Sequence, residues 1–461
     1  MGQDPASAAR PDTPPSTDTP AEPAVVATLR HNRNFRLLWT GQILSDIGSE
    51  FGVLAYPLLI LALTRSPLIA GAVGTITSGM AFLVRLPAGA LADRYDLRRT
   101  MIICDGVRAV VLGLLAGLVA VHEIVWPVVL GVAIIDRVGD TMFTPASVAA
   151  LPRIVGDKQL ESSWAANEAR QYAASLSGPA LGGLLFSLGR AIPFLGDTVS
   201  YGVSVVTSAR MSADFSPKTV EGGRKGLWSE AFDGVHLIWR DPLLRAVIIQ
   251  APLINFAFTG VIFTITIGLR QHGTSPALIG VTQAGIAIGG LLGAIAAPKI
   301  QGRWSMSRLV VALTGGGMVC MVVGSLVMPS PFVAFAIALP LLLSPTTNAA
   351  LFSALLRRTP EHMRGRVNNA LLQVATGLAA LSPLVAGLFV QHFSSNWAMG
   401  SFAAVMGVST ILALTLKGLR QAEAADDKSA EATPPQAEPD REPVGPDDEL
   451  LESRAKPLLP E

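Results

Sequence analysis

The sequence predicts an all-α integral membrane protein with twelve transmembrane helices in two pseudo-symmetric six-helix bundles. Composition is the first observation: of 461 residues, 50% are hydrophobic and only 15% are charged, and the mean hydropathy is positive. Soluble domains rarely have this composition. The second observation is a series of apolar runs near the roughly 20 residues that a helix needs to cross a bilayer. The third is an internal repeat, in which two similar segments lie 200 residues apart.

Twelve apolar segments alternate with short polar breaks from Phe35 onward. Each is long enough to cross a bilayer as a helix with a rise of about 1.5 Å per residue. We expect spans at residues 36–63, 67–92, 99–121, 124–147, 160–188, 191–211, 243–269, 276–298, 307–328, 331–355, 366–391 and 395–417.

These spans divide the chain into five regions. Two polar tails lack apolar runs and are expected to be disordered. In the connector between the halves, apolar residues from Leu227 to Trp239 recur at helical spacing, which predicts an amphipathic helix at the membrane surface. No basic segment precedes an apolar run at the start, so we expect no cleaved signal peptide. The regions are tail 1–34, bundle 35–211, linker 212–242, bundle 243–417 and tail 418–461.

Lysine and arginine residues gather in alternate breaks, including the groups at 94–99, 153–158, 299–308 and 357–366. The opposite breaks offer only Arg65, Arg190 and Arg270. Basic loops remain in the cytoplasm, so we expect a cell-membrane protein with both termini cytoplasmic.

The two halves have similar sequences. PASVAAL from Pro145 and PTTNAAL from Pro345 are 200 residues apart, and Asn167 and Asn369 then correspond. Two parallel six-helix repeats are typical of transporters whose substrate binds at the bilayer midplane between the halves.

The break at residues 89–99 reads GALADRYDLRR. Its pattern, Gly89-x-Leu-x-Asp93-Arg94 followed by Arg98 and Arg99, resembles the loop between helices 2 and 3 of the major facilitator superfamily. The resemblance implies a gating role for these five residues, which lock the two halves together on the cytoplasmic side in one state.

Two positions of the loop depart from the superfamily pattern. The pattern has glycine where this chain has Asp96, and we expect Asp96 to keep the left-handed turn because Asp tolerates that conformation. The following basic position is Leu97 here, so the arginines after it must supply the charge.

Charged residues in the interior of the predicted helices, away from their ends, lie in the N-terminal half. A charge at the centre of a spanning helix costs at least about 2.5 to 3.5 kcal/mol, so each invites a functional hypothesis. The interior of the C-terminal half carries only amides. The charged residues are Asp46, Glu50, Arg85, Asp105, Arg108, Asp136, Arg137, Asp140, Glu168, Arg170 and Asp197.

Four of the acids are candidate proton carriers. Asp46 and Glu50 share one face of the first helix, and Asp136 and Asp140 lie at similar depth in the fourth. A desolvated carboxyl group can load and release a proton, and Arg137 is the expected fixed counter-charge. Structural ion pairs are the alternative.

For Asp105 with Arg108, expected near the cytoplasmic face, and for Asp197, the structural interpretation is favoured. For Glu168 and Arg170 the choice between a structural and a functional role stays open, and Glu168 is a candidate substrate contact. Asn255, Phe256, Phe258 and Gln373 are the expected substrate contacts on the C-terminal side.

The fifth helix contains Gly178-Pro179-x-x-Gly182-Gly183, which matches the core of the superfamily's antiporter motif. Small residues permit close helix approach and proline bends the helix, so packing alone is the alternative interpretation.

Residues 35–417 resemble the superfamily branch of macrolide-efflux and enterobactin-exporter-like proteins, through NFRLLWTGQILSDIGSEFG, FTPASVAALPRIV and SGPALGGLLF. The resemblance implies a monomeric secondary transporter, not an enzyme, which exports a small lipophilic drug, antibiotic or siderophore by alternating access. Protons are the expected coupling ion, with no cofactor, metal or nucleic acid. A proton-coupled nutrient importer, a lipid flippase and a non-transporting receptor or scaffold remain alternatives.

Cys104 and Cys320 are expected to be buried thiols.

Overall fold

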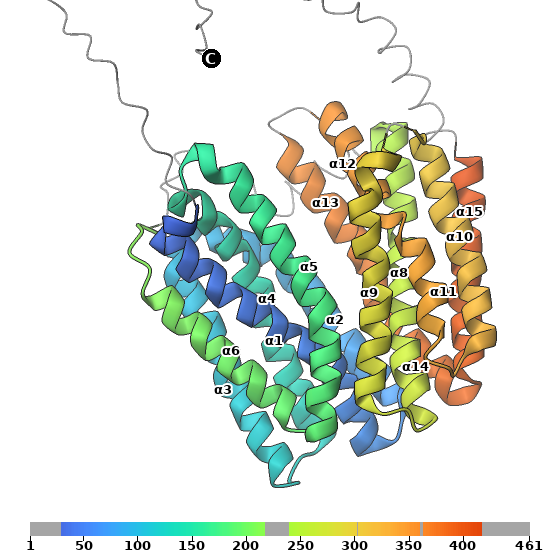
Figure 1. The fold of residues 1–461 in the computed structure, drawn as a ribbon, viewed down its shortest axis with the longest axis horizontal. Coiled ribbons are helices and arrows are strands. Elements are labelled where there is room, and N and C mark those ends of the chain that lie inside the picture. Colours follow the sequence, from blue (N-terminus) through green and yellow to red (C-terminus); the bar gives the residue numbers. More distant parts are fainter. Residues whose placement is uncertain (1–28, 217–238, 302, 360–362, 417–461) are drawn as a thin grey trace, which may run out of the picture.

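The computed structural model describes residues 29–216, 239–301, 303–359 and 363–416. Their helices form two bundles (Figure 1). The expected linker helix and most of both tails lie outside the described residues. The N-terminal bundle comprises α1 (Arg33–Thr64), α2 (Pro67–Arg94), α3 (Leu97–Ala120), α4 (Trp126–Ile154), α5 (Asp157–Leu188) and α6 (Ile192–Ala209). The C-terminal bundle comprises α8 (Pro242–Gln271), α9 (Pro276–Ile300), α10 (Met306–Val327), α11 (Val333–Leu341), α12 (Ser344–Arg358), α13 (Arg364–Gly377), η3 (Leu378–Leu381), α14 (Ser382–His392) and α15 (Ser395–Thr415).

Nine helical stretches of the described chain are long and apolar enough to cross a membrane. The stretch Val333–Arg358 combines α11 with α12. The helices α4, α5 and α6 complete the N-terminal bundle, where α3 packs against α4 and α6, and α1 packs against α5. Together they give the predicted fold of twelve transmembrane helices in two six-helix bundles.

Side-chain caps begin several of these helices and repeat between the bundles. Asn32 caps α1 and Asp241 caps α8, and these residues are 209 positions apart. The caps of the following helices, Ser66 and Ser275, are also 209 positions apart, and each precedes a proline. A side-chain oxygen at this position satisfies free amide groups of the first turn, and proline fits there because it has no amide hydrogen. The internal repeat therefore relates α1 to α8 at a shift of 209 residues.

The bundles touch at one end and diverge at the other, where α1 begins and α15 ends (Figure 1). We call the end where they touch the closed face and the other the open face. At the closed face, Gln391 Oε1 accepts hydrogen bonds from Ser66 Oγ (2.6 Å) and from the Leu68 amide (3.0 Å). On the second seam, the Ala277 amide donates to Ser187 Oγ (2.9 Å). Polar contacts thus join α2 to α14 and α5 to α9.

Each seam is built from the same short motif, a proline followed four residues later by glycine. A Cβ atom on either glycine would clash with the carbonyl oxygen of the proline in the opposite bundle. Backbones at such close approach are typical of helix contacts through small residues. We call these four motifs the clasps, and they are Pro67/Gly71 facing Pro383/Gly387, and Pro179/Gly183 facing Pro276/Gly280.

The two cysteines have different environments. Cys104 is buried and Cys320 is only partly buried, and both are free thiols. The expectation of two buried thiols is therefore correct for Cys104 and wrong for Cys320.

Candidate functional site

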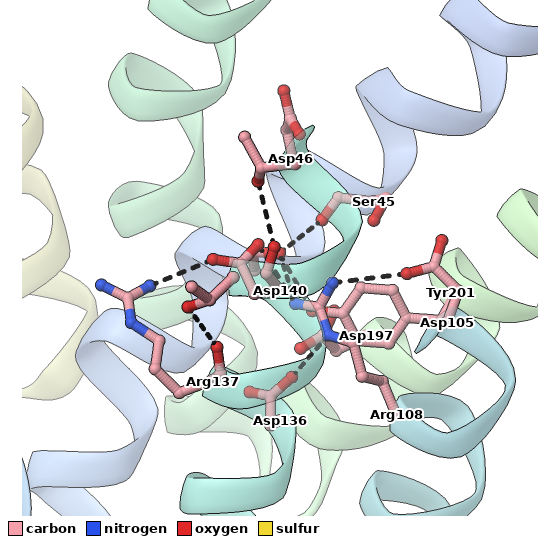
Figure 2. Close-up of polar contacts among 12 residues, drawn as sticks. Ser45, Asp46, Asp105, Arg108, Asp136, Arg137, Asp140, Asp197 and Tyr201 are labelled. Atoms are coloured by element: carbon pink, nitrogen blue, oxygen red, sulfur yellow. Dashed lines mark hydrogen bonds and ion pairs between the residues drawn. The ribbon is translucent and has the colours of Figure 1, made fainter. Parts of the chain in front are cut away.

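Arg108 lies at the centre of the charged residues in the N-terminal bundle (Figure 2). Only 2% of its side chain is exposed. Its Nε lies 2.9 Å from Asp136 Oδ1, its Nη1 lies 3.4 Å from Asp105 Oδ1, and its Nη2 lies 3.7 Å from Asp140 Oδ1. One guanidinium group therefore faces three carboxyl groups. We call Arg108 and these three aspartates the Arg108 cluster.

Hydroxyl groups surround the same guanidinium. Arg108 Nη2 donates to Ser49 Oγ (3.1 Å) and to the hydroxyl of Tyr201, whose ring centre lies 3.9 Å from Cζ. Tyr56 donates to Asp136 Oδ2 (3.2 Å), so both oxygens of Asp136 are hydrogen-bonded. Asp105 Oδ2, in contrast, is buried without a partner among the described residues.

A pocket of about 80 Å³ borders the cluster on its α1, α4 and α5 side. Asp46 forms an ion pair with Arg170 there, and 32% of the Asp46 side chain is exposed. Asp140, with 34% of its side chain exposed, lines the pocket beside Arg108. Glu168 also contributes to its wall. We call this the charged pocket, and it links the buried cluster to a more accessible group of acids.

The candidate proton carriers predicted from the sequence lie in or near this region. Asp136 and Asp140 belong to the cluster and Asp46 to the charged pocket. Glu50 packs against Gly178 and makes no ion pair or hydrogen bond with a described residue. The predicted counter-charge, Arg137, is 51% exposed, and among the described acids it pairs with Asp140, at 3.5 Å.

Arg108, which holds the central position instead, was expected near one membrane surface in a structural ion pair. It is the twelfth residue of the 24-residue helix α3, so it lies at mid-length. The expectation that Arg108 lies near one membrane surface is therefore wrong. Asp197, also expected to be structural, is 2% exposed, and Ser200 Oγ donates to its Oδ1 (3.2 Å).

A second pocket lies in the C-terminal bundle between α8, α10, α11 and α12. Asn255 and Phe258 line it, as do Asn348 and Thr347. Phe256 does not, because consecutive helical residues point about 100° apart; its ring packs against Phe402, with ring centroids 5.4 Å apart.

Gln373 is also absent from this pocket. Its Nε2 donates to the carbonyl of Phe82 on α2 (2.8 Å), so it joins the two bundles. The four expected substrate contacts of the C-terminal side therefore do not share one wall.

The α2–α3 turn is tighter than predicted, with only Tyr95 and Asp96 between the helices. Asp96 is not left-handed, since its φ and ψ are −61° and 119°. Its Oδ1 accepts from the Arg99 amide (2.8 Å), so it caps α3, and the expected turn conformation is wrong.

The expected gating residues lie around this turn. Arg98 donates to the carbonyl of Ala209 at the end of α6, within its own bundle. Gly89 has open space around it, and Arg94 is exposed. The side chain of Asp93 lies outside the described part of the chain. No contact of these described residues joins the bundles in this state.

The glycines of the helix 5 motif face two different helices. Gly178 and Gly182 pack against Glu50 and Phe51 of α1, whereas Gly183 packs against α9 of the opposite bundle. Pro179 belongs to one of the clasps.

Sequence reasoning did not find the hydroxyl groups of the cluster. Ser49 and Tyr201, which accept from Arg108, and Tyr56, which donates to Asp136, come from α1 and α6, and their approach to α3 and α4 depends on helix packing. The available signal was the pair Asp105 and Arg108 in the apolar part of α3 that follows Thr100.

Known proteins resemble the chain over most of its length. A multidrug efflux pump, Tap, of Mycobacterium tuberculosis (strain ATCC 25618 / H37Rv) is 25% identical over 430 residues, covering 89% of this chain and 97% of Tap. The enterobactin exporter EntS of Shigella dysenteriae serotype 1 is 24% identical over 404 residues, covering 86% of this chain and 95% of EntS.

Solved structures share the fold at lower identity. A point mutant of the nucleoside transporter NupG superposes with a TM-score of 0.68 at 11% identity, covering 84% of this chain and all (100%) of NupG. A bacterial homologue of the iron transporter ferroportin, solved in an inward-facing state, superposes with a TM-score of 0.64 at 14% identity. The match covers 83% of this chain and 98% of the homologue. The MFS_3 family, described as transmembrane secretion effector, matches residues 24–445. The chain therefore belongs to this family of major facilitator superfamily transporters, which are not enzymes.

Proposed function

We propose that the protein is a proton-coupled exporter that moves a small lipophilic compound out of the cell by alternating access. The observation that carries the proposal is the Arg108 cluster, in which three carboxyl groups face one buried guanidinium. Fully ionised, the three aspartates would carry two more negative charges than Arg108 offsets. Arg137, which lies 3.5 Å from Asp140, offsets one of them, and one negative charge remains uncompensated. Burying unpaired charge costs several kcal/mol per ion, on the order of the stability of a whole domain. At least one carboxyl group therefore binds a proton in this state.

The unpartnered oxygen of Asp105 supports that assignment. A buried oxygen without a hydrogen-bond donor is less costly on a neutral carboxyl group than on a carboxylate. Asp140 then offers the cluster a route to the charged pocket, because its side chain is 34% exposed there.

The charged pocket has the polar surface that proton exchange with water requires. Two of its buried atoms, Gln42 Oε1 and Arg170 Nε, have no partner among the described residues. Such atoms normally bind water. Asp46 and Asp140 both reach this pocket, and Asp140 and Asp136 both face the guanidinium of Arg108. A change of charge at the pocket is therefore felt at Asp136 through this shared cation.

Export rather than import is favoured by the relatives, which are named as an efflux pump and an exporter, and by the antiporter-like glycines of α5. The basic residues of the open face favour a cell-membrane location with both termini in the cytoplasm. In that orientation the bundles open toward the cytoplasm, where cargo for export is loaded. The cargo belongs to the drug, antibiotic or siderophore class.

The test uses proteoliposomes with an imposed pH gradient and a panel of lipophilic antibiotics and siderophores. A cargo compound should trigger proton movement through the wild-type protein. Asp136→Asn should abolish this coupling, because it removes a titratable group from the cluster and leaves a side chain of the same size. The matched control is Asp214→Asn, which changes an exposed acid outside the helices.

Two results with the cargo compounds, and a third with labelled lipid, would contradict the proposal. One is cargo movement that needs no gradient and is unchanged in Asp136→Asn. The other is cargo that enters with protons, which would identify an importer. Transport of labelled lipid between leaflets in the same vesicles would identify a flippase.

A further inference from the structure

The two pockets described above occupy positions that the internal repeat relates. At the shift of 209 residues between α1 and α8, Asp46 of the charged pocket corresponds to Asn255 of the C-terminal pocket. At the shift of 200 residues fixed by Pro145 and Pro345, Ser147 corresponds to Thr347. Val148 and Asn348 correspond in the same way. The α1 and α4 walls of the charged pocket therefore have counterparts in the C-terminal pocket, whereas its α5 wall has none among the lining residues. We call the C-terminal pocket the amide pocket.

The two pockets differ in charge. The described residues that line the amide pocket include no acid and no base, whereas the charged pocket contains Asp46, Arg108, Asp140, Glu168 and Arg170. The amide pocket is also larger, at about 210 Å³ against about 80 Å³. It is a space for a ligand that brings no net charge, because a charged group there would lose its hydration without gaining a partner.

Apolar side chains supply most of its wall. Ile254 and Phe258 come from α8, Leu313 from α10, Leu341 from α11 and Leu351 from α12. An apolar wall with a few well-placed polar groups is typical of small-molecule sites. An aromatic or branched apolar group would remove this surface from water.

The polar groups of the pocket differ in their freedom to bind a ligand. Both polar atoms of the Gln250 side chain already bond Ser409 of α15: Nε2 donates to the Ser409 carbonyl (2.9 Å), and Oε1 accepts from Ser409 Oγ. Asn255 Nδ2 donates to the carbonyl of Ala251 (2.9 Å). Asn348 makes no hydrogen bond with a described residue, and it is exposed. Its amide can donate to one ligand group and accept from another.

We propose that the amide pocket binds the cargo, and that this cargo is an uncharged molecule with apolar rings and carbonyl, ether or hydroxyl groups that pair with Asn348 and Asn255. The inference rests on the proposed export function and adds the substrate class to it. In this scheme the N-terminal pocket exchanges protons. The C-terminal pocket, where Asn255 stands in place of Asp46 and no described lining residue is an acid, holds neutral cargo.

The test is equilibrium dialysis of the full-length protein in detergent, without a pH gradient. The probe is N-phenyl-1-naphthylamine, which is neutral and has two aromatic systems joined by one N–H group. Leu351→Trp should raise the Kd by about tenfold or more, because an indole ring fills the pocket. The matched control is Phe352→Trp, which enlarges the next residue of α12, an exposed side chain that does not line the pocket.

A second variant, Asn348→Leu, keeps the size of the side chain and removes the amide. It should weaken binding of the probe, whose N–H group has then lost its acceptor. The proposal is overturned if no saturable binding exceeds that of empty micelles, or if Leu351→Trp and Asn348→Leu both bind like the wild type.

The dialysis result is independent of proton coupling, because no gradient is present. Lost binding in the pocket variants together with no cargo-triggered proton movement would support the amide pocket and reject the coupling scheme. Unchanged binding together with normal proton movement would reject the pocket and leave the exporter in place.

Discussion

Arg108 has exchanged nearly all its hydration for contacts with aspartates and hydroxyl groups. Its side chain is 2% exposed, and five groups from α1, α3, α4 and α6 approach its nitrogens. Such a cation holds four helices in register. It also brings the carboxyl groups of Asp105, Asp136 and Asp140 around one guanidinium group.

Replacing Arg108 should destabilise the protein strongly. In Arg108→Gln, buried Asp105 and Asp136 lose their counter-charge, and breaking a buried pair from one side costs about 3 to 5 kcal/mol. Arg137→Gln should change little, because this side chain is 51% exposed. Thermal unfolding of both purified variants, followed by tryptophan fluorescence, gives the comparison.

A double variant separates electrostatic from packing effects. Asp136→Asn should restore part of the lost melting temperature in the Arg108→Gln background, because it removes one of the unpaired charges. Equal melting temperatures of Arg108→Gln and Arg137→Gln would mean that Arg108 is not the central cation of the bundle.

The sequence singled out some acids of this site but not its base. Asp46, Asp136 and Asp140 are visible as charges in apolar runs, whereas Asp105, which also faces Arg108, was assigned a structural role. Choosing between Arg108 and Arg137 required the rotation of α3 and α4 about their axes, which turns Arg108 inward and leaves Arg137 exposed. Weak amphipathic patterns in membrane helices do not determine that rotation, since lipid-facing and buried positions are both apolar.

At the scale of the elements, helix positions were predictable and their breaks were not. The predicted span 331–355 consists of α11 and α12, which are separated at Leu342 and Leu343. The prolines at 340 and 345 flank this break. Each removes a backbone donor, and together they prevent an unbroken ladder of hydrogen bonds. The predicted span 366–391 is likewise divided, by η3 ahead of Pro383.

The contact between the bundles at the closed face depends on the four glycines of the clasps. A methyl group at Gly71, Gly183, Gly280 or Gly387 would meet a backbone carbonyl of the other bundle, and a backbone cannot move aside as a flexible side chain can. The contact exists only while the bundles touch at this face. Larger residues therefore penalise this state and not the one in which the face separates.

Gly71→Ala and Gly280→Ala should each shift the population toward a state open at the closed face. Overpacking costs about 1 to 3 kcal/mol, which corresponds to a shift of about fivefold or more in the equilibrium. Spin labels at Glu123 and Phe393, both exposed at this face, report the change as a longer distance between the bundles.

Gly117→Ala and Gly290→Ala are matched controls, because nothing lies within 4 Å of the added methyl group. They should leave the distance distribution unchanged. If the clasp variants and the controls behave alike, the close approach of the proline carbonyls does not hold this face closed.

For the whole molecule, composition and the repeat were sufficient to predict two six-helix bundles. The state of the transporter was not predictable, because one sequence must specify both the open and the closed arrangement of each face. The contacts of Gln391 with Ser66 and Leu68 belong to only one of those arrangements. They depend on the relative orientation of two rigid bundles, which no local pattern encodes.

The orientation of the molecule in the membrane can be tested at the two ends of one helix. Tyr95 precedes α3 at the open face, and Val121 follows it at the closed face; their exposed fractions are 59% and 63%. Single cysteines at these positions, in a Cys104→Ala, Cys320→Ala background, should react differently with a membrane-impermeant maleimide. We expect Val121→Cys to be labelled in intact cells and Tyr95→Cys only after permeabilisation, because the arginines beside Tyr95 keep that end in the cytoplasm. The reverse pattern would mean that the bundles open toward the outside, and that the structure is the releasing state of an exporter and not its loading state.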